Sequence, residues 1–342
     1  MRAAVFYGPN QPLKIEEVAR PSPGAGEVLV RIASCGVCHT DLHYIDHGVP
    51  TFKNPPLILG HEASGIVEEV GEGVTRVKPG DRVLIPPVFP CGQCEMCRIG
   101  RENVCQNLEM VGNNRDGAYA EYMVAPAKDC IFLPETVPLE EGAVISDAIS
   151  TPFYALVGRA KIQPGDRVVV FGCGGLGLNA IQIASAFGGF VVAVDIREKK
   201  LELARQFGAH EVVHGKEADL PRKIRKLTDG GAHIALEAIG NPEVMNTAFA
   251  CVRPGGTLVI MGYSDRDLTV NAGRLMYREM QILGTLGCPP VLYPRIIQLI
   301  LQGKIRLKEI VTHRFPLDQI NYALELLRKG EETLIRSIVL PL

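Results

Sequence analysis

The sequence predicts an α/β protein of two domains, a β-rich N-terminal domain followed by a doubly wound parallel sheet. Its 342 residues are more than one ordinary core accommodates. Residues 1–147 are rich in Gly and Pro and contain short alternating patterns typical of β-strands. Over residues 148–286, apolar strand patterns alternate with helical ones, as in a parallel sheet covered by helices.

Strand and helix patterns can be placed in order along the chain. The strands expected in the first part lie at 3–6, 27–34 and 64–71, and those in the second at 167–172, 190–195, 233–240 and 256–263. We expect helices at 198–209, 294–304 and 317–330, and a last strand at 334–342. The repeated phrase "PGDRV", at 79–83 and 164–168, predicts a Pro-Gly-Asp turn before a strand in each copy.

Charge and composition exclude some classes of function. The formal net charge is −2, without blocks of like charge, so binding to nucleic acid or to a membrane surface has no electrostatic basis. The uncharged run at 168–194 is long enough for a membrane span, but its six glycines divide it into strand, turn, helix and strand. Ten cysteines, four of them closely spaced, together with an N-terminal apolar run too short for a secretory signal, favour a reducing, cytoplasmic setting.

A glycine fingerprint follows the first strand of the second part. Gly172, Gly174 and Gly177 form G-x-G-x-x-G, which provides a tight turn, close approach of a pyrophosphate and close helix–strand packing. The helix that begins at Gly175 and Leu176 directs unpaired N–H groups at the phosphates. This pattern alone is weak, and a glycine-rich turn in a sheet that binds nothing is the alternative.

An acidic residue strengthens the dinucleotide interpretation. Asp195 ends the next strand, 23 residues after Gly172, where a carboxylate can bind both hydroxyls of the adenosine ribose. Because it would repel a 2′-phosphate, NAD is favoured over NADP, although the nearby Arg197 could weaken that preference.

Four cysteines have the spacing C-x2-C-x2-C-x7-C. Four thiolates complete a tetrahedral shell around Zn²⁺ and leave no open position, so the predicted role is structural. An iron–sulfur cluster would need x3 and Pro at the last step, and a nucleic-acid zinc module would need basic and aromatic neighbours. The four ligands are Cys91, Cys94, Cys97 and Cys105.

A third group of residues includes candidate ligands for a second metal. Cys38 and His61 are a thiolate and an imidazole, both good zinc ligands, and Asp41 and Glu62 lie beside them in the sequence. Asp147 is the only charge between Glu141 and Arg159, in an apolar run where burial would cost several kcal/mol without compensation. Taken singly, Cys38 is better explained as a small buried residue and His61 as a hydrogen-bonded core histidine.

Together, the motifs C-x-x-C-H-T-D at 35–41, G-H-E at 60–62, the cysteine loop and the glycine fingerprint resemble the zinc-dependent medium-chain alcohol dehydrogenases from end to end. The resemblance implies a GroES-like catalytic domain at 1–147, a Rossmann NAD-binding domain at 148–286 and a C-terminal return to the catalytic domain at 287–342. It also implies NAD and two zinc ions per chain, one catalytic and one structural.

In this family the catalytic zinc is held by the Cys of C-H-T-D, the His of G-H-E and a third residue that is usually Cys. These positions are Cys38, His61 and Asp147 here. Two alternatives remain: Asp147 binds zinc directly, or it lies outside the coordination shell and Glu62 enters it or the site is partly empty. A zinc ion with an open fourth position would lower the pKa of an alcohol so that hydride can move to NAD.

Further roles are implied by the same resemblance. Thr40 and His43 correspond to a relay that removes the alcohol proton, and they share a face if this segment is helical. His39 corresponds to a residue facing the pyrophosphate, and Asp41 to the partner of His61. Residues implied to contact the coenzyme elsewhere are Lys200 at the ribose, Ile239 at the adenine and Arg336 at the pyrophosphate.

Apolar segments and the family resemblance also indicate a class of substrate. Apolar segments at 85–91, 110–114 and 151–156 favour a hydrophobic alcohol or ketone, and the chain looks closest to a branch acting on cyclic substrates, which includes 6-hydroxycyclohex-1-ene-1-carbonyl-CoA dehydrogenases. A CoA thioester would need Arg115, Arg274 and Arg278 to converge at the pocket, where their charges could bind its phosphates.

Two rival classes of function remain: a non-catalytic zinc-stabilised binding protein and a zinc-free quinone reductase. By analogy we expect a homo-oligomer, a tetramer or else a dimer.

Overall fold

The computed structural model describes residues 1–341, and the chain forms two compact units. Unit 1 contains Met1–Asp147, Gly287–Leu301 and the chain from Leu307 onward, and unit 2 contains Ala148–Leu286 and Gln302–Arg306. Among the described residues, no helix has both the length and the apolar character needed to cross a membrane.

A seven-stranded mixed sheet forms the centre of unit 1, with the order β10-β6-β5-β3-β18-β17 and β9 also paired to β3. A second sheet has the order β2-β1-β4, and β7 pairs with β8. The strands of unit 1 are β1 (Arg2–Phe6), β2 (Lys14–Glu17), β3 (Glu27–Gly36), β4 (Leu57–Ile58), β5 (Glu62–Val70), β6 (Arg82–Ile85), β7 (Val88–Phe89), β8 (Glu109–Met110), β9 (Tyr122–Pro126), β10 (Ile131–Phe132), β17 (Val311–Pro316) and β18 (Arg336–Leu340). Its α-helices are α1 (His39–Ile45), α2 (Glu95–Arg98), α3 (Leu139–Gly142), α10 (Tyr293–Leu301) and α11 (Ile320–Lys329).

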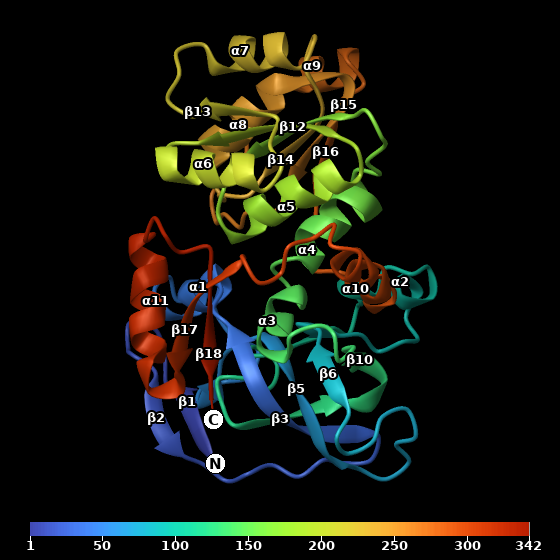
Figure 1. Cartoon of the computed structure of the whole chain (residues 1–342), viewed down its shortest axis with the longest axis vertical. Helices are drawn as coiled ribbons and strands as arrows, with labels where there is room; N and C mark the ends of the chain where they lie inside the picture. The colour runs from blue at the N-terminus through green and yellow to red at the C-terminus, as the bar shows by residue number, and fades with distance from the viewer. Residues whose placement is uncertain (342) are drawn as a thin grey trace. The chain divides into compact units, whose positions relative to one another are not determined.

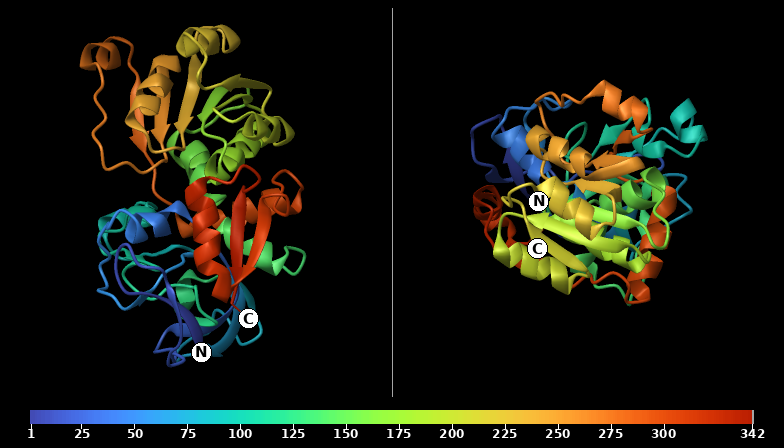
Figure 2. Two further views of the ribbon diagram at one scale, coloured as in Figure 1. Left: turned by 90° about the vertical axis from the view of Figure 1, so that its left-hand side faces the viewer. Right: turned by 90° about the horizontal axis from the view of Figure 1, so that it is seen from above.

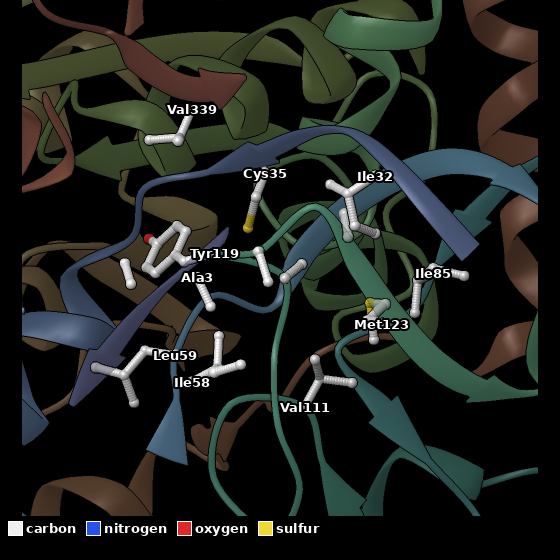
Figure 3. Packing of buried hydrophobic residues seen from close by; sticks show 14 of the residues in the cluster. Ala3, Ile32, Cys35, Ile58, Leu59, Ile85, Val111, Tyr119, Met123 and Val339 are labelled. Atoms are coloured by element: carbon white, nitrogen blue, oxygen red, sulfur yellow. The ribbon is translucent and has the colours of Figure 1, made fainter. Parts of the chain in front are cut away.

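The interior of unit 1 fills with side chains from strands far apart in sequence. Ala3 of β1, Ile32 and Cys35 of β3, Ile85 of β6 and Val339 of β18 are all buried in one cluster. Figure 3 shows these side chains in the interior of unit 1, together with the ring of Tyr119. Because Val339 pairs with Cys35 across β18 and β3, the C-terminal segment completes the sheet begun by the N-terminal residues.

Unit 2 is a six-stranded parallel sheet with the order β13-β12-β11-β14-β15-β16. Helices α5 and α6 lie on the near face in Figure 1, and α8 lies on the opposite face in the view from above in Figure 2. The strands are β11 (Arg167–Phe171), β12 (Phe190–Asp195), β13 (Glu211–His214), β14 (Ala232–Glu237), β15 (Val252–Ile260) and β16 (Gln281–Gly284). The α-helices are α4 (Ser150–Phe153), α5 (Gly175–Ala186), α6 (Glu198–Gln206), α7 (Leu220–Leu227), α8 (Pro242–Cys251) and α9 (Ala272–Tyr277).

Most expected elements are confirmed within a few residues. The four strands expected in the second part are β11, β12, β14 and β15, all with buried apolar centres, and the fold class is the predicted one. Both "PGDRV" copies turn through a glycine with positive φ, Gly80 at 92° and Gly165 at 87°, just before β6 and β11. The last strand is β18, shorter than the expected 334–342, whose final residue lies outside the described part of the chain.

Candidate metal and coenzyme sites

Three local structures bring metal-ligating side chains together in unit 1. Cys38 is the N-cap of α1, directly after β3. His61 and Glu62 stand at the start of β5, after Gly60, whose φ of 91° turns the chain into the strand. Asp147 follows a 3₁₀ turn at 143–145, and the Tyr293 hydroxyl donates to the carbonyl of the preceding Ser146 at 2.6 Å.

The ligand atoms of Cys38, His61, Glu62 and Asp147 all lie within 4.8 Å of one another. Asp147 Oδ2 is 3.8 Å from Cys38 Sγ and 3.8 Å from His61 Nε2. Tetrahedral zinc with bonds of about 2.0–2.3 Å separates its donors by roughly 3.3–3.8 Å. A thiolate, an imidazole and a carboxylate at this spacing therefore fit a zinc ion.

Electrostatics at this cluster also fit a cation. Burial alone would lower the pKa of His61, but the neighbouring side chains of Asp147, Asp41 and Cys38 raise that pKa well above its usual value. Burial raises the pKa of Glu62 to about 7, although the nearby Arg336 guanidinium opposes this. The acidic groups that raise the pKa of His61 would equally favour a cation at this cluster.

Asp41 and Tyr119 form a layer behind His61. Asp41 is fully buried, and its Oδ1 lies 3.7 Å from His61 Nδ1 without a hydrogen-bond partner. Its Oδ2 accepts hydrogen bonds from the Tyr119 hydroxyl at 2.7 Å and from the Cys38 N–H at 3.2 Å. One carboxylate is therefore placed to orient both candidate ligands, His61 through its ring and Cys38 through its backbone.

Glycines make room for this layer. A Cβ on Gly60 would meet the Tyr119 ring at 2.8 Å and Cys35 Sγ at 2.9 Å, so only glycine lets the ring pack beside His61. A Cβ on Gly36, which pairs with Glu62 across β3 and β5, would come within 2.1 Å of Glu62 Oε2. Tyr119 is a residue that sequence reasoning missed.

Arg336 lies in unit 1, buried beside Glu62. Its guanidinium is 3.0 Å from Glu62 Oε1 and donates to the Val37 carbonyl at 3.2 Å, and the side chain of Glu62 is fully buried. Burial opposes the charge on Arg336, but Glu62 raises its pKa above the usual value. The resemblance places this arginine at a pyrophosphate, whereas the described contacts of its guanidinium include a carboxylate and a backbone carbonyl.

Thr40 and His43, the residues of the implied relay, both lie on α1. This segment is helical, which is the condition under which the two residues share a face. Thr40 Oγ1 is 3.6 Å from Cys38 Sγ, so the hydroxyl adjoins the candidate metal ligands. His43 follows one turn later and is half-buried, whereas His39 is exposed. Thr40 and His43 are thus both partly accessible on a helix whose other face, with Leu42, Tyr44 and Ile45, is buried.

The four cysteines at 91–105 also converge. Cys94 Sγ lies 3.5 Å from Cys97 Sγ and 3.7 Å from Cys105 Sγ, and all four sulfur atoms lie within 4.8 Å of one another. The N–H groups of Gln93 and Cys94 lower the pKa of Cys91 to about 6, which favours the thiolate that zinc needs. Four sulfurs and no other described donor in the group fit a closed zinc site.

The glycine fingerprint of unit 2 has the geometry for a dinucleotide. Gly172 has φ of 91°, and a Cβ there would strike Ile239 at 2.6 Å. A Cβ on Gly174 would meet nothing within 4 Å, which leaves space above the loop, and one on Gly177 would fall 1.7 Å from the Gly172 carbonyl oxygen. Gly174 is the N-cap of α5, whose first residues, Gly175 and Leu176, have N–H groups that no preceding turn satisfies.

Other expected coenzyme residues surround this loop. Asp195 ends β12 and accepts hydrogen bonds from the N–H groups of Cys173 at 2.8 Å and Arg197 at 3.0 Å, which fixes its carboxylate beside the loop. Lys200 is buried at the start of α6, with 6% exposure. Ile239 is 53% exposed, so an apolar surface faces solvent near Gly172.

Comparisons with known proteins identify the family to which the chain belongs. Residues 24–135 match the alcohol dehydrogenase GroES-like domain, and residues 175–302 match the zinc-binding dehydrogenase family. An alcohol dehydrogenase of Geobacillus stearothermophilus is 39% identical over 97% of both chains. Structures of an Aeropyrum pernix alcohol dehydrogenase (36% identical, TM-score 0.91, all of both chains) and of Bacillus subtilis 2R,3R-butanediol dehydrogenase (28%, 0.90, 100% and 99%) share the fold. The chain therefore belongs to the zinc-dependent medium-chain alcohol dehydrogenases.

Proposed function

We propose that this protein transfers hydride between NAD(H) and a secondary alcohol or its ketone, with a preference for cyclic or bulky hydrophobic substrates. The observation that carries the proposal is the convergence of Cys38 Sγ, His61 Nε2 and Asp147 Oδ2 beside the Thr40 hydroxyl. These three side chains would hold a catalytic zinc, and Cys91, Cys94, Cys97 and Cys105 a structural one.

Asp147 is the better third ligand than Glu62. The Glu62 carboxylate already faces the Arg336 guanidinium at 3.0 Å, which compensates its charge. Asp147 instead lies within 3.8 Å of both other donors, and its side chain retains 17% exposure, as a ligand of an open catalytic site requires. One thiolate and one carboxylate balance the two charges of zinc.

When bound, zinc would polarise the substrate oxygen and NAD would accept or deliver the hydride. Asp41, held by Tyr119, keeps the His61 ring in one orientation. The Thr40 hydroxyl, 3.6 Å from Cys38 Sγ, is placed to take the alcohol proton and pass it towards His43.

Cofactor choice follows from Asp195. Its carboxylate is fixed by two backbone N–H groups, so it cannot easily turn away from a 2′-phosphate. We propose NAD as the coenzyme, with Lys200 and Ile239 contributing to the adenosine site.

A secondary alcohol is consistent with the similarity to butanediol dehydrogenase, whose name places its hydroxyl groups on internal carbons. A CoA thioester gains no support from the arginines that could bind its phosphates. Arg115 pairs with Glu27 at 2.9 Å and Glu109 at 3.3 Å, and Arg274 donates to the carbonyl of Ala250 at 3.1 Å.

The test is a panel of alcohols and ketones, with zinc counted on the same preparation. Cyclohexanol and fused-ring ketones should be turned over better than ethanol, with NADH formation abolished by a strong chelator. If ethanol is clearly the better substrate, the proposed preference is wrong. If zinc-loaded protein reduces no coenzyme with any alcohol, the activity itself is wrong, and a binding role would replace it.

A further inference from the structure

Two histidines meet at the exposed end of α1. His43 Nδ1 lies 3.2 Å from His47 Nδ1, and the ring centroids are 5.3 Å apart with a 44° tilt between the planes. At this separation one nitrogen must carry a proton and the other a lone pair, because two N–H groups or two lone pairs would repel. The two rings are therefore joined by an N–H···N hydrogen bond, along which a proton can pass from one ring to the other.

His47 extends a row of proton-carrying groups towards solvent. Thr40, His43 and His47 are three and four residues apart, which places them on one face of a helical segment. Asp46, between the last two, still has helical backbone angles, so the spacing carries past the last turn of α1. Thr40 and His43 are partly buried, whereas His47 is exposed.

Charged groups surround the pair and anchor the end of the helix that carries it. Asp46 accepts two hydrogen bonds from the Arg328 guanidinium of α11, at 2.7 and 2.8 Å, which anchors the end of α1. The Asp46 carboxylate also lies close enough to His47 for their charges to interact, and His43 interacts in the same way with His39. Glu325, which lies near Arg328 on α11, partly offsets the arginine.

We propose that His47 receives the alcohol proton from His43 and releases it to water, as the outermost member of the relay. This rests on the proposed dehydrogenase function. Because it acts through His43, His47 is a positioning residue and proton carrier, and it does not touch substrate or coenzyme.

The transfer balances atom by atom. His43 takes a proton at Nε2 and becomes an imidazolium. Its Nδ1–H bond then breaks as an N–H bond forms at Nδ1 of His47. His47 in turn loses its Nε2 proton to a water molecule, so one proton leaves and no electron pair is transferred.

The experiment compares wild type with His47→Gln in alcohol oxidation across pH. Glutamine can accept a hydrogen bond from His43 but cannot carry a proton onward, so a merely structural contact would be preserved. We expect kcat/KM of His47→Gln to fall about tenfold near pH 6.5, which is less than the 10²–10⁴-fold typical of direct general acid–base groups. The loss should diminish towards pH 9, where hydroxide accepts the proton, and added imidazole should restore activity at low pH.

His313→Gln is the matched control, because His313 is in the same unit and its ring bonds to the neighbouring Thr312. This variant should keep the wild-type pH profile and respond little to imidazole. Thermal unfolding of each variant excludes loss of folding as the cause, and His47→Asn should behave as His47→Gln does.

A wild-type pH profile for His47→Gln, without imidazole rescue, would overturn the proposal while leaving the dehydrogenase function intact. Failure of the proposed function would instead appear as inactive zinc-loaded wild type. The two outcomes are distinct.

Discussion

Asp147 lies in a buried segment of the chain, but its carboxylate is partly exposed, a difference that the sequence alone does not show. Its neighbours Ser146 and Ala148 are fully buried, as the apolar run predicts. The carboxylate itself keeps 17% exposure and faces His61 Nε2 at 3.8 Å. The expected cost of a fully buried charge is therefore smaller than the sequence indicates, because water and a metal would both compensate it.

Replacing Asp147 tests direct ligation. The Asp147→Ala variant should bind one zinc per chain where wild type binds two, because only the four-cysteine site remains complete. Asp147→Cys, which restores a thiolate, should bind two. Zinc is counted by elemental analysis after extensive dialysis. Two tightly held zinc ions in Asp147→Ala would contradict direct ligation and favour Glu62 as the ligand.

Sequence reasoning finds candidate residues when their chemistry or spacing is unusual. The four cysteines and the glycine fingerprint have such spacing. Cys38 and His61 are recognised as candidate ligands because their motifs precede the cysteine loop and the glycine fingerprint in the order that the family shows. Tyr119 has no such signal, since its partner Asp41 lies 78 residues away and the two segments meet through the pairing of β9 with β3. The contact of Arg336 with Glu62 likewise depends on β18 joining β3, which no local pattern encodes.

At the scale of elements, long apolar strands are predictable and short peripheral ones are not. β11 and β12 carry runs of valine that leave no alternative to burial. β13 and β16 have four residues each, only one of the eight fully buried, so their strand pairing comes from the neighbouring strand rather than from their own pattern.

The ion pair between α1 and α11 predicts a pH-dependent contribution to stability. Hydrogen bonding to Arg328 lowers the pKa of Asp46, so the contribution is present above the unfolded-state pKa of about 4 and is lost as pH falls through the lower folded-state value. Both side chains are partly exposed, so we expect about 0.5–1 kcal/mol at pH 7. Urea unfolding of wild type and Asp46→Asn measures this difference.

The same comparison at about pH 3 should show the difference diminished, because Asp46 is then protonated in part of the wild-type molecules. A difference between the two proteins that stays constant from pH 7 to pH 3 would contradict the assignment, since a charge-independent cause would then be at work.

The segment 91–105 depends on its metal more than on its own secondary structure. It contains a four-residue helix, α2, and one 3₁₀ turn at 102–104, with Cys97 and Cys105 buried. A closed zinc site supplies folding free energy directly. Cys94→Ser should therefore lose one zinc per chain, lower the unfolding temperature by several degrees and expose this segment to protease.

Asp147→Ala serves as the control for this experiment, because it alters the other metal site. Its segment 91–105 should remain protected from protease. Equal protection in Cys94→Ser and wild type would show that the segment holds its structure without four ligands.

At the scale of the whole molecule, unit 2 has an unfinished edge. β16 is the last strand of the parallel sheet and pairs on one side with β15 among the described residues. Unpaired strand edges invite pairing with another chain unless something blocks them. Met276 and Tyr277, at the end of α9 just before β16, are 73% and 84% exposed, and Leu286 beyond β16 is 50% exposed.

We propose that a second copy of the chain covers this edge, so that the protein is a homo-oligomer in solution, and that exposed apolar side chains stabilise the pairing. Light scattering at micromolar concentration should give a multiple of 37.1 kDa for wild type. Met276→Glu with Tyr277→Glu should shift the mass downward, because two charges per chain would be buried without partners. Phe52→Glu is the control, since Phe52 is 83% exposed but belongs to unit 1, and its mass should not change. A monomeric wild type would show that the chain does not form an oligomer. A double variant with unchanged mass would show that the subunits pair through a surface other than the β16 edge.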